Sequence, residues 1–254
     1  MNETELLTAR LREFDRLSYD RNILKSGSFL SLSEQTVFHR LQREFVNASA
    51  CLEGGHREPD RAVPVFLPDY LTQEDAAPQI VAAVEAAPVN ARFADDLTHR
   101  DFLGALMNLG MERSCIGDIL VDREGRRCVI YCLTDMAGYI VENLTRVKHT
   151  TVTCRILEQA EADIEPQLEE QRCNVASTRL DALVAAVYNL SRQKAQDLIG
   201  AELVFLDGSA ARSAGLTLKE GTRVSVRGYG KFIYDGEEAV TRKGRLFVRV
   251  RRFV

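Results

Sequence analysis

Residues 178–200, TRLDALVAAVYNLSRQKAQDLIG, decide the fold of the C-terminal part of this 254-residue chain. Apolar residues recur at helical spacing in two short runs, which predicts two short helices with inward-facing stripes. The first stripe is Leu180, Leu183, Val184 and Val187, and the second is Ala195, Leu198 and Ile199. Ser191 stands directly before the second run, where its hydroxyl can cap a helix. The sequence therefore predicts a pair of helices joined by a short turn.

Short strands are predicted to follow the two helices. Residues 203–206 form a β-rich run that ends at the turn Asp207-Gly208. A second β-rich run, residues 223–227, comes after the turn at Gly221. We therefore predict an αα-β domain over residues 176–254.

This pattern resembles the S4 RNA-binding domain, a family named for a small-subunit ribosomal protein. The shared motifs are R-L-D-x-x-L, S-R-x-x-A-x-x-L-I, V-x-x-D-G, E-G and V-x-V. The resemblance implies that the start of the second helix and adjoining basic side chains contact the RNA backbone, and helix N-terminal amides and guanidinium groups do suit phosphates. By position, the predicted contacts are Arg179, Ser191, Arg192 and Lys194. An ion pair with Asp181 is the structural alternative for Arg179. Glu202 departs from the family, which often has glycine at this position.

Charge is distributed unevenly along the chain. The net charge is −4, yet residues 172–254 hold 15 lysines and arginines against 8 aspartates and glutamates, a balance of +7 that leaves −11 for residues 1–171. A basic module on an acidic body is expected in a protein that binds nucleic-acid phosphates with one face, because the acidic remainder is repelled from them. A solvated surface that only keeps the protein in solution is the alternative. An acidic run from Glu158 to Glu170 contains Pro166, which disfavours an uninterrupted helix, so we predict an acidic linker over residues 161–175.

The middle of the chain, residues 76–160, alternates strands and helices. Strands are predicted at 79–87, 116–121, 127–133 and 150–157, with a hairpin turn at 122–125. Helices are predicted from Thr98, which forms a capping box with Asp101, to Leu109, and from residue 134 to about 144. The order βαββαβ predicts a ferredoxin-like domain, the fold of RNA-recognition (RRM) modules. Because the central strand offers only Tyr131 for base stacking, we expect RNA contacts at loops or helix ends, with His99 and Arg100 as candidates.

The first 75 residues are predicted to form a mainly helical domain. Leu7, Leu11 and Phe14 mark one helical face, and Ser31 with Glu34 forms a capping box for a second helix. Residues 62–67 are predicted to form an edge or irregular strand because Pro64 interrupts the run. The predicted fold class is therefore α+β, with a helical N-terminal region, a ferredoxin-like middle domain and an S4-type C-terminal domain.

Further motifs resemble the YlmH proteins of bacteria. They are VRGYGKF at 226–232, TRKGRL at 241–246, LTHRDFLGALMNLG at 97–110, IGDI at 116–119 and FLPDY at 66–70. The resemblance implies a cytoplasmic, ribosome-associated factor of translation quality control, with large-subunit rRNA and peptidyl-tRNA as partners. Arg227, Tyr229 and Lys231 complete the predicted RNA-binding residues. A monomer is favoured.

Two other function classes stay open. The first is an RNA-modifying enzyme, because pseudouridine synthases also carry an R-L-D motif. However, no Thr-Ser-Gly follows Asp181, and fewer than 75 residues remain after it. The second is a protein-interaction adaptor linked to cell division. We predict no catalytic residues, cofactor or metal, since the six cysteines include no C-x-x-C pair. Cys128 and Cys132 are interpreted as buried thiols, with a redox or metal pair as the alternative. No segment is long and apolar enough to span a membrane, and the start lacks the pattern of a secretory signal.

Overall fold

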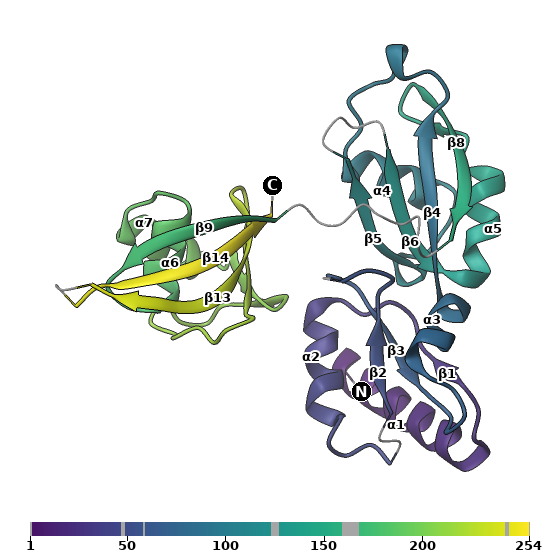
Figure 1. Ribbon diagram of the computed structural model, residues 1–254, viewed down its shortest axis with the longest axis horizontal. Coiled ribbons are helices and arrows are strands. Elements are labelled where there is room, and N and C mark those ends of the chain that lie inside the picture. The colour runs from purple at the N-terminus through teal and green to yellow at the C-terminus, as the bar shows by residue number, and fades with distance from the viewer. Residues whose placement is uncertain are drawn as a thin grey trace. The chain divides into compact units, whose positions relative to one another are not determined.

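The computed structural model describes residues 2–46, 49–57, 59–122, 127–158, 168–241 and 244–253. The chain forms two compact units, Met1–Glu165 and Pro166–Val254 (Figure 1). Both combine helices with antiparallel sheets, in agreement with the predicted mixture of α and β structure. None of the described helices is long and apolar enough to cross a membrane.

The N-terminal part of the first unit packs helices against a small sheet. Its helices are α1 (Glu3–Arg21), α2 (Leu32–Leu41) and α3 (Gln73–Ile80), and its strands are β1 (Lys25–Ser26), β2 (Cys51–Glu53) and β3 (Val63–Phe66). The predicted capping box of Ser31 and Glu34 is present at the start of α2. Leu11, Phe38 and Phe66 meet in the core between the helices and the sheet.

The prediction of an edge strand around Pro64 is wrong. The sheet order is β1-β3-β2, so β3 lies in the middle. Proline lacks only the backbone donor, and the carbonyl oxygen of Pro64 still accepts a hydrogen bond from the Gly27 amide at 3.0 Å. Because β1 and β2 are only two and three residues long, the missing donor disrupts little of the pairing.

The middle part follows the predicted order of elements. Its strands are β4 (Val81–Pro88), β5 (Ile116–Val121), β6 (Cys128–Leu133), β7 (Arg146–Val147) and β8 (Thr150–Leu157). Its helices are α4 (His99–Asn108) and α5 (Thr134–Asn143), with short 3₁₀ turns at Ala91–Phe93 and Arg113–Cys115. The strands pair in the order β5-β6-β4-β8-β7, and α4 and α5 pack on one face of the sheet (Figure 1). Of the predicted hairpin turn at 122–125, residues 123–125 lie outside the described residues.

The other face of this sheet shares a core with the N-terminal part. Phe29, Val63 and Val65 pack in one apolar cluster with Tyr131 and Leu157. The predicted boundary between domains 1–75 and 76–160 falls inside α3, whose residues join the same cluster. The boundary is therefore wrong as a division between separate domains, because the N-terminal part has one core of its own around Phe38 and shares a second core with the middle sheet.

The second unit is a six-stranded sheet with the predicted helical pair on one face (Figure 1). The helices are α6 (Leu180–Val187) and α7 (Arg192–Gly200). The strands are β9 (Leu168–Val175), β10 (Val204–Leu206), β11 (Ser209–Ala210), β12 (Arg223–Val226), β13 (Gly230–Val240) and β14 (Leu246–Phe253), in the order β11-β10-β12-β13-β14-β9. Every residue of the two predicted helical stripes is buried.

The predicted linker at 161–175 is wrong over its second half. Residues 168–175 form β9, and residues 161–167 lie outside the described residues. Strand β9 pairs with the basic strand β14, with Glu170 opposite Arg251 and Glu169 opposite Arg252. Two of the acidic residues that indicate a linker in the sequence, Glu169 and Glu170, are therefore complementary to a strand that follows much later in the chain.

Candidate nucleic-acid interface

A buried carboxylate at the start of α6 fixes two of the predicted RNA-binding arginines. The Asp181 side chain is fully buried. It accepts hydrogen bonds from Arg179 at 3.2 Å to each oxygen, from Arg192 at 3.1 and 3.0 Å, and from Gln196 at 2.8 Å. The Arg179 and Arg192 side chains nevertheless remain 43% and 50% exposed. Since a guanidinium has five donors, each arginine is held by Asp181 and still presents donors to solvent.

Asp181 is ionised at neutral pH. Burial by itself raises the pKa of its carboxyl, but the hydrogen bonds from Gln196, Arg179 and Arg192 outweigh burial and hold the pKa below its ordinary value. The ion pair that the sequence offers as the alternative for Arg179 is therefore present. It positions the guanidinium without burying it, so it is compatible with a contact to RNA.

Ser191 and Lys194 occupy the first turn of α7. The Ser191 hydroxyl oxygen accepts a hydrogen bond from the Lys194 amide at 3.1 Å, which confirms the predicted cap. The Lys194 side chain is exposed. The first turn of a helix carries amides without intrahelical partners and a positive dipole end. Anions are therefore attracted to the side of the molecule where Arg192 and Lys194 lie.

The remaining predicted residues of the second unit lie around the turn between β12 and β13. Tyr229 is 36% exposed, and its ring centre is 5.6 Å from that of Tyr188. The exposed side chains of Arg227 and Lys231 lie over partly buried phenylalanine rings, with Arg227 4.9 Å from the ring centre of Phe205 and Lys231 5.7 Å from that of Phe253. The seven predicted residues thus form two groups, one at Asp181 and the start of α7 and one around this turn.

Glu202 takes a backbone conformation that favours glycine. It directly follows the C-cap of α7 and has φ 56°. The Leu203 amide bonds the Leu198 carbonyl at 3.0 Å, and the Glu202 amide bonds the Ile199 carbonyl at 3.1 Å, which together close a Schellman motif. The resemblance to the S4 family implies glycine here, and the left-handed conformation gives the physical reason.

The candidates in the middle part, His99 and Arg100, are exposed in the first turn of α4. The predicted capping box is present, because the Asp101 carboxylate accepts hydrogen bonds from the Thr98 amide at 2.8 Å and the Thr98 hydroxyl at 2.6 Å. Asp101 also pairs with Lys148 at 2.8 Å. The hydrogen bonds from Lys148 and then Thr98 lower the pKa of Asp101 to about 2. Asp101 is therefore a capping residue, as predicted, and leaves His99 and Arg100 to face solvent.

The sheet face opposite α4 and α5 is not a stacking platform. Tyr131 is only 1% exposed, and its ring centre lies 4.8 Å from that of His56. On the same face, Glu85 forms ion pairs with Arg127 and, at 2.7 Å, with Arg155. In the described strands β4, β6 and β8, this face exposes no aromatic ring, in line with the expectation that RNA contacts lie elsewhere in this part of the chain.

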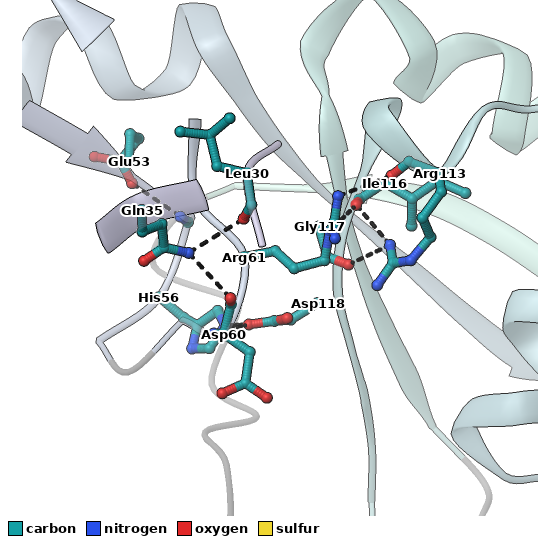
Figure 2. Close-up of polar contacts among 11 residues, drawn as sticks. Leu30, Gln35, Glu53, His56, Asp60, Arg61, Arg113, Ile116, Gly117 and Asp118 are labelled. Carbon is teal, nitrogen blue, oxygen red and sulfur yellow. Dashed lines mark hydrogen bonds and ion pairs between the residues drawn. The ribbon is translucent and has the colours of Figure 1, made fainter. Parts of the chain in front are cut away.

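A polar cluster between β5 and the N-terminal part was not predicted (Figure 2). Arg61 and Arg113 both donate to the Ile116 carbonyl, at 3.0 and 2.6 Å, and His56 pairs with Asp118 at 2.9 Å. Burial, followed by the charge of Arg61, lowers the pKa of Arg113 to about 10. These side chains are directed at backbone carbonyls and at one another. We therefore assign the cluster, which includes Asp118, to joining the two parts of the first unit.

Cys128 and Cys132 are buried thiols. Both are fully buried and free. Burial raises the pKa of Cys132 to about 12 and that of Cys154 to about 11, so neither is a ready thiolate. Within the described ranges, no group of three or more histidine, cysteine, aspartate or glutamate side chains could hold a metal ion.

Several neighbours of the predicted residues were missed. Gln196 lies four residues after Arg192, one helical turn along the same face, so helical spacing could have placed it beside Asp181. Tyr188, Phe205 and Phe253 become neighbours of Tyr229, Arg227 and Lys231 only through strand pairing and helix packing. No short-range pattern in the sequence indicates that these residues become neighbours.

Comparisons with known proteins support the resemblance. Residues 84–161 match the family model described as "Putative RNA-binding domain in YlmH". The chain is 26% identical, over 94% of its length and 91% of the relative's, to the ribosome-associated protein quality control protein P2 of Bacillus subtilis.

A solved structure, the cell division protein ylmH from Streptococcus pneumoniae, matches with a TM-score of 0.51 at 20% identity, covering 64% of this chain and 95% of that one. At this identity the match supports the fold alone. The family model over the middle part and the similarity along nearly the whole chain confirm that this protein resembles the YlmH family.

Proposed function

We propose that this chain is a non-catalytic RNA-binding protein that associates with the large ribosomal subunit and with peptidyl-tRNA during the quality control of stalled translation. The observation that carries the RNA contact is the pair Arg179 and Arg192, fixed on buried Asp181 yet about half exposed. A guanidinium that is already positioned loses less conformational freedom when it binds a phosphate. The balance of +7 over residues 172–254 attracts the same ligand.

The proposed folds of the two RNA-binding parts fit this role. The order βαββαβ and the strand order β5-β6-β4-β8 support a ferredoxin-like, RRM-like middle domain. The helical pair on an antiparallel sheet supports an S4-type second unit. Because the sheet face of the middle domain is covered or ion-paired, we assign its RNA contact to His99 and Arg100 at the start of α4.

The ribosomal partner rests on the printed name of the relative, a ribosome-associated quality control protein. Large-subunit rRNA and tRNA, a cytoplasmic location and a monomeric state are parts of the same proposal. An RNA-modifying activity is disfavoured, because the carboxylate of the R-L-D motif, Asp181, is buried and holds three side chains. A protein-interaction adaptor is the second candidate; the solved structure of similar fold is named a cell division protein, but the match supports the fold alone.

The test is sedimentation of lysate through sucrose gradients at low and high salt, with detection of this protein and of peptidyl-tRNA in the large-subunit fraction. We expect salt-sensitive co-migration, lost in Arg192→Gln with Lys194→Gln and retained in the charge-matched control Arg40→Gln with Arg43→Gln, in the last turn of α2 and just after it. For purified Arg192→Gln with Lys194→Gln, the plot of log RNA-binding constant against log salt concentration should be less steep by about 1–2 units.

The single variant Lys194→Gln is the control for misfolding of the double variant, because Lys194 has no part in the Asp181 cluster and its loss should leave the fold intact. Unchanged co-migration of the folded double variant would overturn the assignment of these residues. A complex that resists RNase but contains the protein would favour the adaptor.

A further inference from the structure

The six-stranded sheet of the second unit has a face turned away from α6 and α7. Val224, Phe232 and Val250 point into the core beneath the helices. Successive residues of a strand alternate between faces, and directly opposed residues share a face. Ser225 lies opposite both Phe205 and Lys231, so these three side chains belong to the other face.

A row of side chains crosses this outer face. It runs from Phe205 on β10 through Ser225 on β12 and Lys231 on β13 to Phe253 on β14. Phe205 and Phe253 are three strand spacings apart, roughly 14 Å. Arg227, which directly follows β12, joins the row because its guanidinium lies over Phe205. We name Phe205, Arg227, Lys231 and Phe253 the outer row.

The composition of the outer row is unusual for a solvent-facing sheet surface. The open face of an antiparallel sheet is normally polar, whereas here two partly exposed phenylalanine rings each lie under a cation, at 4.9 and 5.7 Å. The same arrangement recurs farther along the face, where Arg172 lies 4.0 Å from the ring centre of Phe247. Cations over aromatic rings could simply cover apolar surface. A row of such pairs also offers what a single-stranded nucleic acid needs, namely rings for its bases and cations for its phosphates.

Charge divides the outer face into two regions. Glu238 pairs with Arg172 at 2.8 Å and with Arg249 at 3.2 Å, and Asp235 pairs with Arg251 at 2.7 Å. These carboxylates offset the basic residues on β9 and β14. The outer row lies apart from these three ion pairs, with Arg227 on Phe205 as its centre.

We propose that the outer row binds unpaired RNA: Arg227 and Lys231 move off the rings of Phe205 and Phe253 to hold phosphates, and bases stack on the ring faces that they uncover. The ligand is single-stranded because the rings need the flat face of a base, which a duplex hides in its own stack. The inference rests on the proposed function only in sharing Arg227 and Lys231 with it. The cluster around Asp181 belongs to the helices on the other side of the sheet and is a separate surface.

A tryptophan reporter tests the stacking directly. The chain contains no tryptophan, so Phe205→Trp in the full-length protein carries a single fluorophore within the outer row. We expect a 12-nucleotide uridine RNA to quench its fluorescence at saturation and a blunt 12-base-pair RNA duplex to leave it unchanged. The control is Tyr19→Trp on α1, where Tyr19 is 61% exposed. Equal quenching of both variants, or no quenching of Phe205→Trp by bound uridine RNA, would overturn the proposal.

A second variant separates this inference from the proposed function. Phe205→Leu with Phe253→Leu keeps apolar bulk but removes both rings. We expect its affinity for the uridine RNA to fall by at least about fivefold, the lower end of what one stacked base contributes, with duplex affinity unchanged. If this variant binds both RNAs normally while Arg192→Gln with Lys194→Gln does not, the outer row is refuted and the proposed function stands. If the wild-type protein binds neither RNA, both fail.

Discussion

The substitution Asp181→Asn tests whether the buried carboxylate positions the arginines for RNA. It removes the charge that accepts hydrogen bonds from Arg179, Arg192 and Gln196. Removing one partner of a fully buried ion pair costs about 3–5 kcal/mol. Because the two arginines left behind are 43% and 50% exposed and water can solvate them, we expect a smaller loss of unfolding free energy, about 2–3 kcal/mol. Urea denaturation followed by circular dichroism measures it.

The effect of Asp181→Asn on RNA binding distinguishes positioning from simple attraction. The substitution makes the protein more positive by one unit, so attraction alone predicts tighter binding. Fixing a long side chain costs about 0.5–1.5 kcal/mol, and two arginines lose their anchor. We therefore expect binding to weaken by about 1–3 kcal/mol, or roughly 5- to 150-fold, in fluorescence anisotropy at a temperature where the variant is folded.

The matched control for this test is Asp197→Asn on α7. Asp197 is exposed and accepts a hydrogen bond from Gln193 at 2.9 Å, so its substitution makes the same change in charge without touching the arginines. Binding by Asp181→Asn as tight as that of Asp197→Asn would refute the idea that Asp181 prepares Arg179 and Arg192 for a phosphate.

Three further predictions concern the stability of the two units. Glu202→Gly should raise the unfolding free energy by about 0.5–1 kcal/mol in urea, because it relieves a left-handed backbone worth about 1–2 kcal/mol but adds freedom to the unfolded chain; an unchanged midpoint would contradict the strain. Thr98→Ala should lower stability by about 1 kcal/mol through loss of the helix cap, and a neutral result would show that the cap contributes nothing. The pKa of Asp101 falls from its ordinary value of 3.8 to about 2, so its contribution is present above about pH 4 and lost as the pH falls toward 2. Thermal unfolding of Asp101→Asn should therefore change less than that of the wild type across this window, and parallel profiles would disprove the assignment.

Features that depend on near neighbours in the chain could be predicted from the sequence. The stripes of α6 and α7, the caps at Ser31, Thr98 and Ser191, and the order of elements in the middle part all follow from spacings of two to four residues. The ion pair of Arg179 with Asp181 was foreseen as an alternative for the same reason.

Features that depend on pairing between distant parts of the chain could not be predicted from the sequence. The sequence of β9 is polar and is typical of a linker. It forms a strand because β14, which carries the opposite charges, pairs with it in the folded protein. The division at residue 75 fails because Tyr131 and Val63 meet only in the folded core. The rings beneath Arg227 and Lys231 come from separate strands, so the outer row exists only once the sheet has formed.

The pairing of β9 with β14 has a consequence for how the second unit is made. The hydrogen bonds from Arg245 to Asn174 join residues 71 positions apart, and contacts of such long range slow folding. During synthesis β9 emerges before α6. Its backbone groups stay without their strand partner until residues 246–253, which form β14, have also emerged. Its charged side chains, Glu169 and Glu170, protect such an unpaired strand from pairing with other chains. A nascent copy of this protein therefore completes the unit that carries most of its predicted RNA-binding residues only when translation has passed its last strand.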